Sequence, residues 1–230
     1  MSTVLISGAN RGLGLEFARQ YAASGATVLA TCREPRLATA LAQIAGVEVC
    51  PLDVGSAASV AALATSLEGR PIDILINNAG RLSTSHVGHN DPEAVLEMLR
   101  VNTIGPLMLS EALIENLAAS TRRLIVTVTS DLGSLSDNVK PNVKGGGGYL
   151  GYRVSKAGVN MVMRTLAVEL KPRNISCILL TPGWVRTDMG GSNATLSPAQ
   201  SVTGMCRVIE RIELRDSGRW FDHSGQECNW

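Results

Sequence analysis

The sequence predicts an α/β fold built as a doubly wound parallel sheet with helices on both faces. Short apolar runs of strand length alternate with segments of helical periodicity along almost the whole chain. A glycine-rich turn over residues 8–14 follows the first apolar run and opens the first helical segment. The chain has 230 residues, of which 45% are apolar, so one domain spanning 1–230 can bury a large core.

The elements follow in order from these patterns. Short apolar runs predict strands over residues 4–6, 27–31, 47–49, 72–76, 124–128, 175–180 and 219–221. Helical periodicity predicts helices over 13–24, 36–45, 56–67, 92–117, 152–170 and 200–212. Gly25 ends the first helix and Pro172 ends the fifth, whereas Gly105-Pro106 interrupts the long fourth segment. Strands joined by crossover helices predict parallel pairing throughout.

Composition narrows the classes of function. The net charge of +1 gives no general attraction to nucleic acid or to an anionic membrane. No apolar run is long enough for a membrane span, and the N-terminal residues lack the pattern of a secretory signal. The five cysteines are scattered without CxxC spacing, which predicts reduced thiols in a cytoplasmic protein. His86 and His89 lack a third ligand at metal-binding spacing, so no metal is expected.

The glycine turn is a candidate nucleotide phosphate site. Glycines permit a tight turn and close backbone approach, and the following helix offers free N–H groups at its N-terminus. The spacing G-x-x-x-G-x-G differs from the common dinucleotide fingerprint, and a purely structural glycine turn remains the alternative. The second strand carries Arg33 at its end in place of the acid that usually holds an NAD ribose. Arg33 and Arg11 together favour a 2′-phosphate, hence NADP(H) over NAD(H).

The pair Tyr152 and Lys156 lies one helical turn apart, on one face of a predicted helix. A phenol can protonate a carbonyl oxygen, and a nearby ammonium is expected to lower the phenol's pKa toward the working range. Ser130, at the end of the fifth strand, is placed to hydrogen-bond a substrate oxygen. Asn102 is a poor helix former inside the long helical segment, where it predicts a local bend.

Taken together, these motifs resemble the short-chain dehydrogenase/reductase family over essentially the whole chain. The resemblance is carried by the glycine turn, Asp53, the run Asn77-Asn78-Ala79-Gly80, Asn102, Ser130, Tyr152-x-x-x-Lys156 and Pro182-Gly183. The stretch from Thr181 to Gly191 and Trp230 are similar to the C-factor and Sniffer-like carbonyl reductase group. This implies a Rossmann-like doubly wound seven-stranded parallel sheet and a nicotinamide cofactor lying across the strand ends.

The resemblance also implies roles for individual residues. Asn102, Ser130, Tyr152 and Lys156 are the implied catalytic set, with Asn102 and Lys156 in a proton relay. The implied cofactor contacts are Gly8, Asn10, Arg11, Gly12, Leu13, Gly14, Arg33, Asp53, Val54, Asn78, Ala79, Gly80, Tyr152, Lys156, Pro182, Gly183, Val185 and Thr187. Residues 184–200 form the expected substrate loop.

Two departures from the family pattern bear on the site. Ser7 stands where threonine is usual and still offers a hydroxyl. The interval from Ser130 to Tyr152 is longer than usual because of residues 138–148, which include the glycine run 145–148, so Ser134 and Ser136 compete for the role of Ser130. The glycine run itself predicts a flexible loop before Tyr152.

The leading hypothesis is an NADP(H)-dependent reductase of a small-molecule ketone or aldehyde. A nucleotide-binding signalling protein of C-factor type, with little or no turnover, is the rival, and a different reaction on the same fold remains open. The family commonly pairs the helices over 92–117 and 152–170 in a four-helix interface. The second of these is apolar nearly all round, so a homodimer or homotetramer is expected.

Overall fold

The computed structural model describes residues 2–84, 86–139 and 148–230. A seven-stranded sheet with the order β3-β2-β1-β4-β5-β6-β7 runs through the molecule, and neighbouring strands in it pair in parallel. The strands are β1 (Thr3–Ile6), β2 (Thr27–Cys32), β3 (Val47–Pro51), β4 (Ile74–Asn77), β5 (Leu124–Val128), β6 (Ser176–Thr181) and β7 (Trp220–Asp222). The predicted fold class is therefore confirmed.

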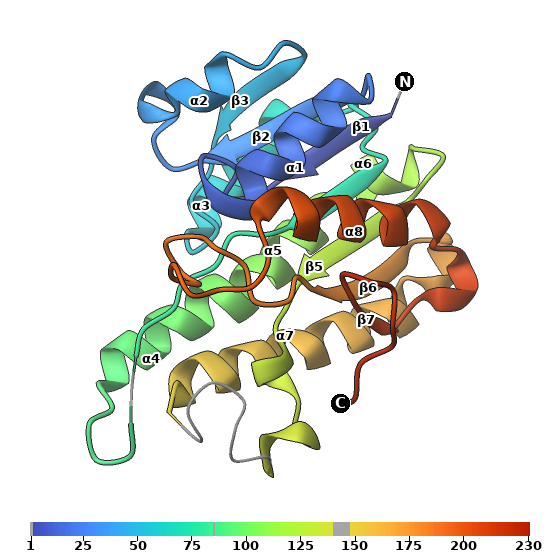
Figure 1. Ribbon diagram of the computed structural model, residues 1–230. Coiled ribbons are helices and arrows are strands. Elements are labelled where there is room, and N and C mark those ends of the chain that lie inside the picture. The colour runs from blue at the N-terminus through green and yellow to red at the C-terminus, as the bar shows by residue number, and fades with distance from the viewer. Residues whose placement is uncertain (1, 85, 140–147) are drawn as a thin grey trace.

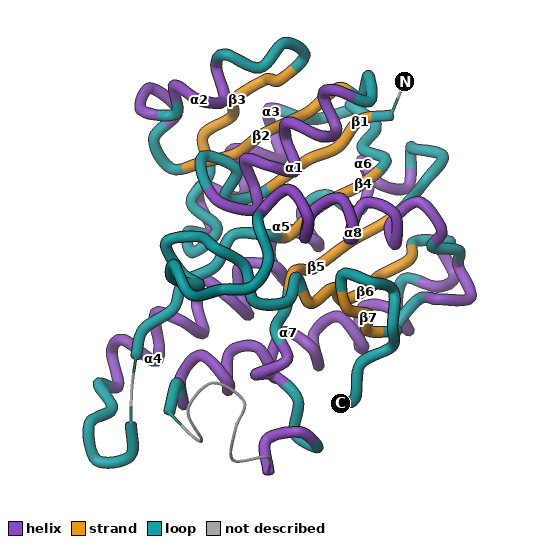
Figure 2. The backbone as a smooth tube through the Cα atoms, in the orientation of Figure 1, coloured by secondary structure: helices purple, strands orange, loops and turns teal. Residues whose placement is uncertain are grey.

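The helices cover both faces of this sheet (Figure 1). They are α1 (Gly12–Ala23), α2 (Thr39–Ala42), α3 (Ala57–Ser66), α4 (Pro92–Leu99), α5 (Gly105–Ala112), α6 (Ile114–Ala118), α7 (Leu150–Glu169) and α8 (Pro198–Arg211). The tube in Figure 2 places α1 and α8 on one side of the strands and α5 and α7 on the other. Among the described residues no helix combines the length and the apolar content that crossing a bilayer requires.

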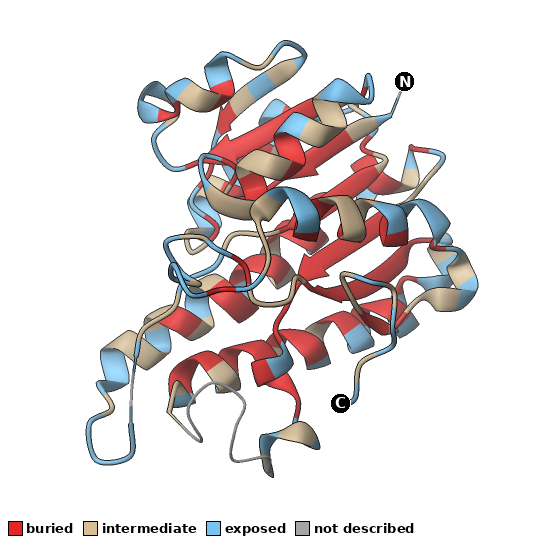
Figure 3. Ribbon diagram, in the orientation of Figure 1, coloured by how far each residue is buried: buried red, intermediate tan, exposed pale blue. Residues whose placement is uncertain are grey.

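Alternation along the strands explains why the sheet is covered twice. In β1, Val4 and Ile6 join the cluster that packs under α1 and α8, whereas Leu5 joins the cluster under α3, α5 and α7. Successive side chains of a strand point to opposite faces, so a strand that is apolar at every position needs a layer on each side. Figure 3 shows the result, with the inner strands buried, the edge strand β3 partly exposed and the outer helix faces exposed.

Two predicted helices differ from the observed ones. The segment 36–45 forms only a 3-10 turn over Pro35–Leu37 and the single turn of α2, because Ala38 between them leaves helical geometry at φ −86° and ψ 50°. The segment 92–117 divides into α4, a π-helical turn over Arg100–Ile104, α5 and α6. The π turn contains Asn102, where the sequence predicts a bend.

Candidate active site

A cleft of about 1480 Å³ lies at the carboxyl ends of the strands, the edge where open parallel sheets bind ligands. The strand arrows in Figure 1 point toward the loop between β6 and α8, which covers this side. The residues expected to bind a cofactor that line the cleft are Gly8, Asn10, Arg11, Gly12, Leu13, Arg33, Asp53, Val54, Asn78, Ala79, Gly80, Tyr152, Lys156, Pro182 and Thr187.

The remaining predicted residues lie behind this lining. Gly14 is buried under the glycine turn, where a β-carbon would overlap the carbonyl oxygen of Gly8. Gly183 and Val185 belong to the covering loop, and Val185 is buried and bridges to Leu196. Asn102 and Ser130 lie behind the lining and act on it through hydrogen bonds.

Hydrogen bonds tie the glycine turn to the turn after β4. Ser7 Oγ accepts from the backbone N–H groups of Asn78 and Ala79, both at 3.0 Å. The Asn78 side-chain amide donates back to the carbonyls of Ser7 at 2.9 Å and Gly8 at 3.1 Å. Gly8 adopts φ +65°, and a β-carbon there would lie 2.8 Å from Ala79 Cα, so only glycine fits. The serine that replaces the usual threonine thus fixes both walls of the cleft.

Two arginines stand at the same end of the cleft. Arg33 follows β2, is exposed, and makes no ion pair with a described residue. Arg11 in the glycine turn reaches Asp188 in the covering loop, with 3.1 Å between Nη1 and Oδ2. Both partners are mostly exposed, so this pair is weak and easily exchanged for another anion. Asp53 is exposed on the neighbouring wall, and its Oδ1 accepts from Gly55 N–H at 2.9 Å.

The other end of the cleft holds the buried pair on α7. Tyr152 and Lys156 are 8% and 5% exposed, and the Lys156 ammonium lies 5.7 Å from the centre of the Tyr152 ring. Lys156 Nζ donates to the Val128 carbonyl at 2.8 Å. Burial lowers the pKa of Lys156 to about 8.

The pKa of Tyr152 moves opposite to the sequence expectation. Burial raises it to about 12, a hydrogen bond with Ser130 lowers it, and the charge of Asp131 raises it. The charge of Lys156 is not among these causes, and burial lowers the pKa of that lysine as well. The phenol of the unliganded protein is therefore a neutral proton donor near pH 7.

Of the three serines considered, Ser130 is the one whose hydroxyl lowers the pKa of Tyr152. Ser134 and Ser136 lie within 3.2 Å of each other through their hydroxyls, and both bond to the Trp230 carbonyl. Gly133 lets this loop approach α7, since a β-carbon there would lie 2.9 Å from the Lys156 carbonyl carbon. Residues 140–147 of the longer interval lie outside the described residues.

Asn102 lies in the π turn and supports the cleft from there. Its Oδ1 accepts from Arg81 N–H at 2.8 Å, and its Nδ2 donates to the Arg81 carbonyl at 2.8 Å and to Ser155 Oγ at 2.9 Å. A β-carbon on Gly80 would lie 3.6 Å from Asn102 Oδ1 and 4.0 Å from Lys156 Nζ. Asn102 thus holds the turn after β4 against α7, close to the lysine.

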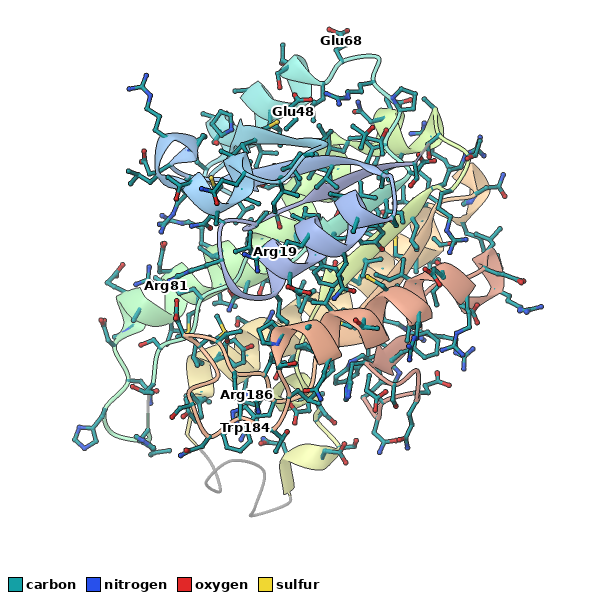
Figure 4. The ribbon with its side chains drawn as sticks, turned by 45° about the horizontal axis from the view of Figure 1, so that its top comes forward. Arg19, Glu48, Glu68, Arg81, Trp184 and Arg186 are labelled. Carbon is teal, nitrogen blue, oxygen red and sulfur yellow. The ribbon has the colours of Figure 1, made fainter. Side chains whose placement is uncertain are left out.

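Sequence reasoning missed several residues around the cleft. Arg81 and Asp188 directly follow Gly80 and Thr187, so adjacency to predicted site residues was the available signal. Arg19 on α1 and Tyr149 before α7 also line the cleft, and nothing local in the sequence marks them. Figure 4 shows Arg19 on α1, Arg81 on the far rim, and Trp184 and Arg186 in the covering loop.

The covering loop is held by its own hydrogen bonds. Trp184 Nε1 donates to the Gly190 carbonyl at 2.7 Å, and Arg186 donates to the carbonyls of Ala194 and Thr195 at 2.9 and 3.0 Å. The loop that was expected over 184–200 ends earlier, because α8 begins at Pro198 after the Ser197 cap. Its conformation is therefore largely preformed over the cleft.

The histidines of the loop before α4 are exposed, and Asp91 beside them caps α4 by accepting from Glu93 N–H at 3.0 Å. Within residues 2–84, 86–139 and 148–230, no three His, Cys, Asp or Glu side chains form a group that could hold a metal.

Comparison with known proteins agrees with this geometry. The family model described as short chain dehydrogenase matches residues 2–196. The protein belongs to the short-chain dehydrogenase family. Within it, the chain is 40% identical to the C-signal of Myxococcus xanthus over 170 residues, which are 74% of this chain and 99% of that protein.

Two solved structures of this family resemble the whole chain. The NADPH-bound carbonyl reductase from chicken fatty liver is 32% identical with a TM-score of 0.91, and covers 100% of this chain and 99% of its own. The carbonyl reductase Sniffer of D. melanogaster is 29% identical with a TM-score of 0.90, and both chains are covered completely. The similarity to the C-factor and Sniffer-like group is thus confirmed.

Proposed function

We propose that this short-chain dehydrogenase is an NADP(H)-dependent reductase that converts a ketone or aldehyde to an alcohol. The observation that carries the proposal is the cluster of Tyr152, Ser130 and Lys156 at one end of a cleft whose other end holds the glycine turn and two arginines. The residues that would bind the cofactor and the residues that would deliver the proton then lie around one continuous cleft.

The residues present fit a dinucleotide. The glycine turn leads directly into the N-terminus of α1, where free N–H groups face the cleft and suit a pyrophosphate. The cleft volume of about 1480 Å³ exceeds the ~300–1,000 Å³ of common small-molecule sites, which leaves room for a cofactor and a substrate side by side. Asp53 and Val54 would hold the adenine end, and Asn78, Ala79 and Gly80 the adjoining wall.

Arg33 and Arg11 support NADP(H) rather than NAD(H). Arg33 rather than an acid directly follows β2, and its guanidinium, which makes no ion pair with a described residue, matches a 2′-phosphate. Arg11 would exchange its exposed contact with Asp188 for the same phosphate. The chicken carbonyl reductase, described as NADPH-bound, supports this assignment.

The nicotinamide supplies or accepts the hydride when it is bound. Tyr152 donates its phenolic proton to the substrate oxygen, since the raised pKa keeps that proton in place at neutral pH. Ser130 hydrogen-bonds the same oxygen and stabilises its developing charge. Lys156, one turn along α7, would hold the nicotinamide ribose, and Asn102 would orient water beside Lys156 for return of the proton.

The covering loop would complete the nicotinamide end. Pro182 and Gly183 begin the loop, and Gly183 adopts φ +74°, which a side-chain-bearing residue rarely adopts. Thr187 lies near the glycine turn, since a β-carbon on Gly12 would be 3.5 Å from its Cγ2. The Thr187 hydroxyl and the Val185 backbone are the groups we assign to the carboxamide.

Replacing the phenol tests the reaction. We expect Tyr152→Phe to lower kcat for NADPH-dependent carbonyl reduction by about 10³-fold or more, because general acid catalysis contributes ~10²–10⁴-fold. NADPH affinity should change little, since the ring and its packing remain. The measurement is NADPH consumption across a panel of ketones and aldehydes, with NADPH titration of both proteins. A variant as active as the parent would contradict the assignment of Tyr152.

Replacing Arg33 tests the cofactor. Arg33→Ala should weaken NADPH binding by about 10-fold or more and leave NADH binding nearly unchanged, because only NADPH carries the 2′-phosphate. Tryptophan fluorescence and NADPH fluorescence titrations measure both affinities. Arg215→Ala removes an equally exposed guanidinium that does not line the cleft and serves as the matched control. Equal loss of both cofactors in Arg33→Ala would argue against phosphate recognition.

A signalling role without turnover is the second candidate, and the 40% identity to the C-signal of Myxococcus xanthus favours it. The intact set of Tyr152, Lys156, Ser130 and Asn102 favours the enzyme. One variant distinguishes the two functions. If Tyr152→Phe abolishes turnover but the protein keeps its biological effect, the signalling role is supported.

A further inference from the structure

The residue after Ser130 is an acid, and it is bonded to the serine. Ser130 Oγ donates to Asp131 Oδ1 at 3.0 Å. The Leu132 N–H donates to the same carboxylate oxygen at 3.1 Å and to Ser130 Oγ at 3.2 Å. These bonds form where Ser130 caps the short 3-10 helix Asp131–Gly133. Asp131 therefore has a fixed place next to the hydroxyl that faces Tyr152.

Tyr152, Ser130 and Asp131 differ sharply in burial. Tyr152 and Ser130 are each 8% exposed, whereas Asp131 is exposed. An exposed carboxylate thus stands beside a desolvated phenol. The charge of Asp131 raises the pKa of Tyr152, against the lowering by the Ser130 hydrogen bond.

The other charged groups around Tyr152 do not cancel Asp131. On α7, Lys156 is buried and its pKa is lowered to about 8. Across the cleft, Arg81 and Glu97 pair with each other at 3.5 Å. On the C-terminal side Cys228 stays neutral, because burial and then the charges of Asp222 and Asp131 raise its pKa to about 12. Within the part of the chain that the structure describes, Asp131 makes no ion pair.

We propose that Asp131 is a positioning residue that holds the hydroxyl hydrogen of Ser130 and keeps Tyr152 loaded with the proton it delivers to the substrate oxygen. The inference rests on the proposed carbonyl reduction. While Asp131 takes the single Ser130 hydrogen, that hydrogen is withheld from the phenol oxygen, where it would favour the phenolate. An arriving substrate oxygen competes with the carboxylate for that hydrogen. Asp131 thus acts through Ser130 and through its charge, without touching substrate.

The kinetic test uses a substitution that removes the charge of Asp131 and keeps the shape of its side chain. Asp131→Asn retains an acceptor for the Leu132 N–H, so the loop should stay in place. Reduction requires a protonated phenol, hence its rate falls at high pH as Tyr152 ionises. Without the negative charge of Asp131 the phenol ionises more easily. We therefore expect the alkaline limb of the kcat/KM profile to lie about 0.5 to 1 pH unit lower than in the parent protein.

Two controls separate charge from perturbation. Asp131→Glu keeps the charge and should keep the alkaline limb near that of the parent. Glu68→Gln makes the same charge change at an exposed position that does not line the cleft, and should not move the limb. An Asp131→Asn limb that coincides with the parent and Glu68→Gln would overturn the inference.

A readout without turnover keeps this inference separate from the proposed function. The chain has three tyrosines, so carbon-13 labelling at the phenolic carbon gives three resonances, of which Tyr152→Phe identifies one. The Tyr152 resonance should titrate at lower pH in Asp131→Asn than in the parent, over the range in which both stay folded. Identical titrations would refute the role of Asp131 even in an active enzyme. A shifted titration in a protein that reduces no carbonyl would refute the reaction and retain the coupling.

Discussion

At the scale of single residues, the chemistry of Tyr152 and Lys156 was readable from their spacing, but their protonation was not. A spacing of four residues places an ammonium near a phenol. It does not reveal that Tyr152 is only 8% and Lys156 only 5% exposed, so that desolvation opposes the charged form of each. Asp131 shows the same limit, because its influence depends on the path of the loop after β5.

The buried Lys156 should lower stability at neutral pH. Its pKa falls from the ordinary 10.5 to about 8 on folding. Below pH 8 the lysine is therefore charged in both the folded and the unfolded protein, and the full cost of burying that charge lowers the free energy of unfolding. Between about pH 8 and 10.5 the unfolded chain binds more protons than the folded one, and stability rises with pH. Lys156→Met should therefore stabilise the unliganded protein at pH 7, by about 2 kcal/mol after the lost bond to Val128 is counted.

Denaturant unfolding at several pH values measures this effect. The gain of Lys156→Met over the parent should shrink as the pH rises through the window, while turnover is lost at every pH. Lys171→Met, at an exposed lysine after α7, is the matched control and should show no such pH-dependent gain. A variant less stable than the parent at pH 7 would show that the ammonium is well solvated or compensated in the folded protein.

At the scale of elements, periodicity predicted the strands and most helices, because burial on both faces leaves strong apolar runs. It failed where tertiary contacts decide the backbone. The π turn over Arg100–Ile104 is favoured by bonds from Asn102 to Arg81 and Ser155, which lie 21 and 53 residues away in sequence. A poor helix former marked the place of the bend, whereas its form depended on those partners.

Glycines explain how the site's elements come so close together. Gly105 at the start of α5 meets the loop after β3, where a β-carbon would lie 3.0 Å from the Val54 carbonyl oxygen. Gly133 lets the loop that carries Ser130 pack onto α7 beside Lys156. Sequence shows that these positions are glycine but not which backbone approaches them, so the cleft lining was predictable only in part.

At the scale of the whole molecule, α7 carries an apolar stripe that faces outward. Val159, Met163 and Leu166 are buried against the sheet, whereas Val154, Met161 and Val168 are 45%, 68% and 74% exposed. The exposed three recur every seven residues and so share one face of the helix. We propose that this face pairs with a second copy of the chain, as expected for a homodimer or homotetramer.

Light scattering tests this proposal. Met161→Glu places a charge in the centre of the stripe and should dissociate the oligomer, because an unpaired carboxylate is costly in an apolar interface. Leu37→Glu makes the same change at a side chain that is 78% exposed away from α7, and should leave the assembly intact. A monomeric parent protein would rule out the interface.

The π turn also makes the site sensitive to the number of residues as well as to their kind. A π turn holds one residue more than the α turn that would replace it. Deleting one residue from Arg100–Ile104 would let the segment close as a regular α-helix with little rotation of α4 relative to α5, because the π turn takes up its extra residue locally. The bulged backbone from which Asn102 bonds to Arg81 and Ser155 would then be lost. The extra residue of this turn is thus as much a part of the proposed site as the side chains around it.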